Sequence, residues 1–266
     1  MIDGSRSFHQ IRRELTLTEM DRRANEIKKN LVAIIDSTHK CAPVRLAKSY
    51  KLAMEHEGKR GLHGREACLE RAIYRQYKYR PGHPREFLSE VCPFILAYQV
   101  PLRNSRSDHG WRTVDLMGAS GDWLPVVVEL KEEESKATPL LMLVEAAGYA
   151  VAIRKAWNDT KGCLLEEWRK SIERVMAASA PKFEWPDELQ TVPIICAAPR
   201  AYWRQRRGKA GVEPNALPKE AWKALADLMS ALNDKGFPVT LVEFDAKNGV
   251  GDEPMIDQVA SFAPPV

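Results

Sequence analysis

The sequence predicts an α/β protein, a mixed sheet flanked by helices, with a helical and basic N-terminal region. Short apolar runs rich in valine and isoleucine, typical of buried strands, alternate with longer stretches that have helical periodicity. The first eighty residues hold 18 Lys and Arg against 10 Asp and Glu, whereas the rest of the chain holds 22 against 26. We expect a basic helical region over residues 1–80, a sheet domain over residues 81–247 and a surface tail over residues 248–266.

Basic residues and tyrosines alternate near the end of the N-terminal region, where Arg75, Lys78 and Arg80 occur within six positions. Such a stripe suits a nucleic-acid backbone, with aromatic faces available to the bases. A solvated helix face that carries long basic side chains is the alternative interpretation. The helices expected in this region cover residues 16–36, 43–56 and 64–79.

The sheet domain is expected to open with a short helix over residues 83–92. Pro84 suits a first helical turn, and Pro93 should end the helix because proline cannot continue it. Apolar runs and helical periodicity then predict the remaining elements in order. These are strands over residues 94–102, 111–118, 123–131, 191–198 and 238–244, and helices over residues 138–157 and 218–232.

Charged residues end two neighbouring apolar segments. Three consecutive valines favour a strand before Glu129, so Glu129 and Lys131 should point to the same face of it. If the preceding segment pairs beside this strand, Asp115 joins them at the edge of the sheet. Two carboxylates are oxygen ligands suited to Mg²⁺, and a lysine beside them can orient an attacking water. An edge-strand ion pair between Glu129 and Lys131 is the alternative.

The helix expected over residues 138–157 is apolar on nearly all sides and should be buried. Glu145 is the single charge in its central part, and Tyr149 lies one turn later on the same face. A buried glutamate needs a cation or a hydrogen-bond donor. Lys131 is the partner that we expect, and an arginine elsewhere in the chain is the alternative.

These motifs, in this order, resemble the PD-(D/E)xK nuclease superfamily. They are a strand that carries Asp115, a strand with Glu129 and Lys131, and a helix with Glu145 and a tyrosine one turn later. The resemblance covers roughly residues 83–198 and implies a restriction-endonuclease-like core of a helix, a three-stranded meander, a second helix and a fourth strand. A valine precedes the aspartate, where the family has its name-giving proline.

The resemblance implies an endonuclease, a metal-dependent phosphodiesterase that hydrolyses nucleic acid. DNA is the expected substrate, and phage defence, restriction and repair are the expected settings. Mg²⁺ or Mn²⁺ would be held by Asp115 and Glu129. A glutamate of the first helix often completes the metal site in this family, and Glu90 is our first choice, with Glu86 and Glu66 as competitors. The catalytic residues that the resemblance implies are Asp115, Glu129, Lys131 and Glu145.

A second basic cluster follows the fourth expected strand, over residues 199–209, and we expect it in a loop. Arginines capture phosphate oxygens through paired donors, so this loop is a second candidate for contacts with a nucleic-acid backbone. The expected nucleic-acid contacts in the two basic clusters are Arg75, Lys78, Arg80, Arg200, Arg204, Arg206 and Arg207.

Composition and sequence patterns indicate the cellular compartment of the protein. The 5 cysteines are scattered without a CxxC pair, the N-terminus lacks a signal-peptide pattern, and no apolar run is long enough to span a bilayer. We therefore expect a cytoplasmic protein without a membrane partner. The sequence leaves open whether the chain forms a homodimer or binds a partner protein. Two alternatives to an enzyme remain open: a non-catalytic nucleic-acid-binding or assembly module that keeps the nuclease fold, and a charge network that supports a protein interface.

Overall fold

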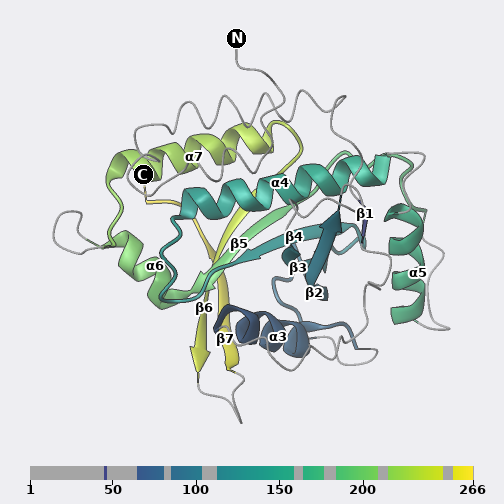
Figure 1. The fold of residues 1–266 in the computed structure, drawn as a ribbon, viewed down its shortest axis with the longest axis horizontal. Coiled ribbons are helices and arrows are strands. Elements are labelled where there is room, and N and C mark those ends of the chain that lie inside the picture. The colour runs from purple at the N-terminus through teal and green to yellow at the C-terminus, as the bar shows by residue number, and fades with distance from the viewer. Residues whose placement is uncertain are drawn as a thin grey trace.

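A computed structural model describes residues 45–46, 65–80, 85–103, 113–158, 164–176, 184–208, 215–247 and 254–265. Strands β1 to β7 of these residues lie side by side in chain order (Figure 1). The strands are β1 Arg45–Leu46, β2 Phe94–Arg103, β3 Thr113–Ala119, β4 Pro125–Leu130, β5 Ile194–Pro199, β6 Val239–Lys247 and β7 Met255–Phe262. The helices are α3 Arg65–Tyr77, α4 Pro139–Asn158, α5 Leu164–Met176, α6 Arg200–Arg207 and α7 Lys219–Asn233.

The sheet is mixed, as the sequence predicts. β2, β3 and β4 form an antiparallel meander, whereas β4, β5 and β6 run parallel to one another. Parallel neighbours need a crossover connection, and helices supply it: α4 and α5 lie between β4 and β5 in the chain, and α6 and α7 lie between β5 and β6. β7 closes the series antiparallel to β6.

Helices cover both faces of the sheet. α4 and α7 lie along one face and α3 along the other (Figure 1), which divides the apolar interior into two clusters. β4 and β5 are buried along their whole length because both of their faces are covered. Among the described helices, none has the length and apolar character needed to cross a membrane.

The helix that precedes the meander is α3, and residues 85–92 form a turn instead of the expected helix. The Leu88 and Cys92 backbones hydrogen-bond across this turn. Phe87 and Cys92 fill the apolar layer under α3, and this tertiary packing overrides the local helix signals. α3, whose residues were expected in the basic region 1–80, packs against β2 and β3 of the sheet.

Four further segments differ from the sequence prediction, and the first is α5, which lies where no element was expected. β7 lies within residues 248–266, which were expected as a surface tail. β1 lies within the helix expected over residues 43–56, and the rest of that helix and the one over residues 16–36 fall outside the described residues. Residues 200–207 form α6 instead of a loop, because Tyr202 and Trp203 on one side of this helix are buried against the sheet.

Candidate active site

β3 and β4 place the two predicted carboxylates side by side. Their register pairs Leu116 with Val128, so Asp115 lies directly opposite Glu129. The two carboxyl groups are within hydrogen-bonding reach of each other. Asp115 Oδ2 also accepts a hydrogen bond of 2.8 Å from the Leu130 backbone N–H, which fixes this carboxylate at the end of β4.

Lys131, directly after β4, joins three elements through its ammonium group. Nζ lies 2.7 Å from Glu129 Oε1, 3.3 Å from Glu145 Oε2 on α4 and 3.4 Å from Glu66 Oε1 on α3. An ammonium has three donors, so each carboxylate can receive one of them. The ion pair predicted between Lys131 and Glu145 is present, and α3 adds a third partner from the opposite face of the sheet.

Two polar residues at this site were not predicted from the sequence. Glu70 lies one turn after Glu66 on α3 and is buried, with 4% of its surface exposed. Gln99 on β2 lies directly opposite Asp115, since the neighbouring pairs are Tyr98 with Leu116 and Val100 with Val114. The side chains of Gln99 and Glu70 share a hydrogen bond. A row of polar residues therefore crosses β2, β3 and β4, from Gln99 through Asp115 to Glu129.

Burial raises the pKa of three acids in this cluster: Asp115, Glu129 and Glu70. Desolvation raises the pKa of Asp115 to about 6, although Lys131 and the Leu130 amide oppose the change. Desolvation and the negative charge of Asp115 raise the pKa of Glu129 well above its ordinary value. Desolvation, with Asp115 and a neighbouring glutamate, raises the pKa of Glu70 to about 9. The cluster therefore has more carboxylates than one ammonium can neutralise. It favours the binding of protons or of a further cation.

The ammonium of Lys131 remains charged despite its burial. Desolvation lowers the pKa of this group, but Glu129, Asp115 and Glu145 outweigh that effect and raise the pKa well above the ordinary value of a lysine. Lys131 is 8% exposed, so this charge is held almost entirely by protein groups. The site therefore contains one permanent cation among several acids.

The donor set fits a divalent cation held by two carboxylates. Glu129 Oε2 is buried and makes no hydrogen bond, and the carboxyl group of Asp115 lies within hydrogen-bonding reach of the Glu129 carboxyl group. Mg²⁺ is usually held by one or two protein carboxylates and completes its shell with waters and phosphate oxygens. Within the described residues, no group of three or more His, Cys, Asp or Glu side chains encloses a metal position. The reason lies in Lys131, on which the carboxylates of Glu66, Glu129 and Glu145 converge.

The structure changes which glutamate of the first helix reaches the site. Glu90 is exposed in the turn before β2, and this turn leads to the end of β2 that pairs with Ala119, away from Asp115. Glu86 lies in the same segment and is also exposed. Glu66, the remaining competitor, contacts Lys131 because α3, and not residues 83–92, is the helix beside the meander.

The predicted basic stripe of α3 separates into a surface part and a core part. Arg75 and Arg80 are exposed, and Lys78 is partly exposed with Nζ 5.5 Å from the centre of the Tyr74 ring. Tyr74 and Tyr77 are buried in the apolar cluster under α3. These two rings pack the core and are not available to stack on bases, whereas the cations keep access to solvent.

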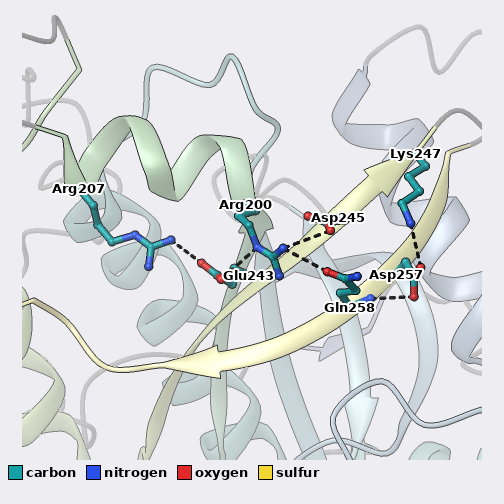
Figure 2. Close-up of polar contacts among 7 residues, drawn as sticks. All are labelled: Arg200, Arg207, Glu243, Asp245, Lys247, Asp257 and Gln258. Atoms are coloured by element: carbon teal, nitrogen blue, oxygen red, sulfur yellow. Dashed lines mark hydrogen bonds and ion pairs between the residues drawn. The ribbon is translucent and has the colours of Figure 1, made fainter.

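The arginines of α6 differ in their surroundings. Figure 2 shows Arg200 between Glu243, Asp245 and the Gln258 side chain, and Arg207 paired with Glu243. With the Lys247–Asp257 pair, the residues drawn there carry three cations and three anions. This network joins α6 to the β6–β7 hairpin and leaves little net positive charge for a phosphate.

The other two arginines of α6 point in different directions. Arg206 is 3% exposed and donates a hydrogen bond of 2.6 Å to the Ser135 carbonyl, with its guanidinium stacked on the Tyr202 ring. The nucleic-acid contact predicted for Arg206 is therefore wrong, because this buried side chain donates hydrogen bonds to carbonyls of the loop after β4. Arg204 is exposed and stays a candidate for a phosphate contact.

Comparison with known proteins gives no match for this chain: no family model, no curated protein and no solved structure matches it.

Proposed function

We propose that this protein is a metal-dependent phosphodiesterase that cleaves nucleic acid, with DNA as its substrate. The observation that carries the proposal is the pair of carboxylates, Asp115 and Glu129, on neighbouring strands beside the buried ammonium of Lys131. The element order α3, β2, β3, β4, α4, β5 supports the resemblance to the PD-(D/E)xK nuclease superfamily. Restriction, repair and phage defence are the settings that this resemblance suggests.

Each residue has a distinct role in the proposed reaction. Asp115 and Glu129 hold Mg²⁺ or Mn²⁺, which when bound lowers the pKa of a coordinated water and neutralises charge on the phosphate. Lys131 orients the attacking water and stabilises the negative charge that develops on the phosphate oxygens. Glu145 positions Lys131 from α4, and Glu66 does so from α3.

The substrate would reach this edge of the sheet through contacts with its backbone. Arg75 and Arg80 on or near α3 and Arg204 on α6 are exposed cations that can contact phosphates. Such contacts are independent of base sequence, so they fix the position of the nucleic acid without selecting a sequence. DNA as the substrate follows from the family resemblance.

Cleavage of supercoiled plasmid DNA by the purified full-length chain, with Mg²⁺ or with EDTA, tests the proposal. Asp115→Ala and Glu129→Ala should abolish the Mg²⁺-dependent cleavage while the protein stays folded. Glu133→Ala is the matched control, because Glu133 is an exposed acid in the loop directly after the site. Full cleavage by Glu129→Ala would remove this residue from the mechanism.

A non-catalytic nucleic-acid-binding module is the second candidate. One observation favours it: Lys131 already has three carboxylate partners, so the described charges form ion pairs without a metal. Calorimetric titration with Mg²⁺ separates the candidates, because a binding module has no need of a cation at Asp115 and Glu129. A heat of Mg²⁺ binding that the parent shows and Asp115→Ala lacks supports the enzyme. DNA binding by a parent protein that shows no heat of Mg²⁺ binding supports the module.

A further inference from the structure

We infer that Lys131 acts as the resident cation of this site, that a divalent cation displaces its ammonium from Glu129, and that Glu145 and Glu66 then retain it. This inference rests on the proposed metal site and adds an exchange of partners to it. Glu145 and Glu66 are positioning residues in this scheme, since they act on the metal through Lys131.

The shortest contact of Lys131 is with a residue that would also hold the metal. Nζ lies 2.7 Å from Glu129 Oε1, while Glu129 Oε2 is buried without a hydrogen bond. The Asp115 carboxyl group lies within hydrogen-bonding reach of the Glu129 carboxyl group. A divalent cation between Asp115 and Glu129 would therefore lie close to the ammonium of Lys131. Two cations so close to each other repel strongly where water is excluded. Binding of the metal consequently favours movement of Nζ away from Glu129.

Two other carboxylates already contact the ammonium and can keep it. Glu145 Oε2 lies at 3.3 Å and Glu66 Oε1 at 3.4 Å, from helices on opposite faces of the sheet. A lysine suits such a movement, because its ammonium is a point charge with three rotatable donors on a flexible stem. Loss of the short contact to Glu129 therefore leaves two ion pairs in place, and the charge does not have to leave the protein.

Glu145 should be the stronger of the two remaining partners. Its side chain is 9% exposed, whereas that of Glu66 is 38% exposed. Water competes with the ion pair of Glu66, while the low-dielectric surroundings of Glu145 strengthen its pair with Lys131. The exchange scheme therefore makes Glu145 the residue that most assists metal binding without contacting the metal.

The first test measures the affinity of the full-length, metal-free protein for Mg²⁺ by calorimetry. Lys131→Met removes the competing cation and should bind Mg²⁺ roughly tenfold more tightly than the parent, because a like charge is lost beside the metal. Lys136→Met is the matched control, since Lys136 is exposed in the same loop, and it should change the affinity little. An unchanged or weaker affinity in Lys131→Met overturns the exchange.

The second test is a double-mutant cycle, which shows whether Glu145 acts through Lys131. Glu145→Gln should weaken Mg²⁺ binding severalfold in the parent and have little effect in the Lys131→Met background. An equal effect in both backgrounds would mean that Glu145 attracts the metal directly, and it would overturn the positioning role. Glu133→Gln, at an exposed site, corrects for the general loss of one negative charge.

A readout on the unmutated lysine covers the case in which Lys131→Met fails to fold. The ¹³Cε signal of Lys131, assigned by its absence in Lys131→Arg, should move on Mg²⁺ titration with the midpoint found by calorimetry. A Lys131 signal that stays in place at saturating Mg²⁺ overturns the exchange while the metal site stands. Absence of Mg²⁺ binding in the parent and in Lys131→Met would overturn both the exchange and the proposed function.

Discussion

Gln99 of β2 lies directly opposite Asp115 of β3. The backbone of Gln99 adopts a left-handed conformation with φ 49°. Few side chains adopt this conformation in a strand, because it brings Cβ close to the following carbonyl. Strained backbone at a residue other than glycine often accompanies a functional site. Here it coincides with a hydrogen bond between the Gln99 side chain and the buried carboxyl of Glu70.

This geometry predicts different outcomes for two substitutions of Gln99. Gln99→Ala keeps the backbone strain and removes the partner of Glu70, so it should lower the free energy of unfolding by about 1–2 kcal/mol. Gln99→Gly also removes the hydrogen bond but relieves the strain, so it should be about 1 kcal/mol more stable than Gln99→Ala. Urea unfolding of both variants measures the difference. Equal stability of the two would argue against strain at this position.

The buried carboxyl of Glu70 predicts a dependence of stability on pH. Its pKa is raised to about 9 by desolvation and by nearby acids, against an ordinary value of 4.5 in the unfolded chain. Between these values the folded chain binds more protons than the unfolded chain, so the free energy of unfolding falls as pH rises.

Glu70→Gln carries no charge at any pH and should reduce this fall. Asp115 and Glu129 also have raised pKa values, so part of the dependence should persist in the variant. The variant should therefore gain stability relative to the parent between pH 5 and 9, as measured by urea unfolding in EDTA. Parallel pH profiles for parent and variant would show that Glu70 does not titrate in this window.

The main elements of the sheet domain follow from local sequence patterns. The valine run before Glu129 and the continuous apolar stretch of residues 191–198 correspond to the buried strands β4 and β5. The apolar sequence around Glu145 corresponds to α4. In each case the pattern is long and consistent with burial on all sides, so the same solution satisfies local propensity and tertiary packing.

The residues missed at the site depend on contacts that local patterns do not record. Glu70 on α3 and Gln99 on β2 meet because the helix packs against the meander. Arg206 is buried because the Tyr202 ring packs on its guanidinium and carbonyl groups after β4 accept hydrogen bonds from its Nη2. An arginine-rich sequence predicts exposure in the absence of such partners.

Substitution of Glu145 tests how much the ion-pair cluster contributes to the free energy of unfolding. The loss of Glu145 leaves Lys131 with Glu129 and Glu66. The loss of stability should therefore be smaller than for a buried ion pair without other partners. Glu145→Leu should lower the free energy of unfolding by about 1–3 kcal/mol, and Glu145→Gln, which keeps an acceptor, by less. Thermal melting compares the two variants. Parent-like melting of Glu145→Leu would contradict the contribution of this ion pair.

The last prediction separates two exposed arginines of α6 by their partners. Arg204 is a candidate for a phosphate contact, whereas Arg207 pairs with Glu243 and its guanidinium lies 4.9 Å from the centre of the Phe262 ring. Each phosphate contact contributes a little under one unit to the slope of log affinity against log salt.

Arg204→Ala should therefore flatten this slope for duplex DNA by about 0.9 units, while Arg207→Ala should leave it nearly unchanged. Fluorescence anisotropy over a series of salt concentrations, with EDTA to prevent cleavage, measures both slopes. Both substitutions remove one arginine from the same helix, so the comparison controls for net charge. A slope that Arg207→Ala flattens as much as Arg204→Ala would show that DNA displaces Glu243 from Arg207, and an unchanged slope in both would place the DNA away from α6.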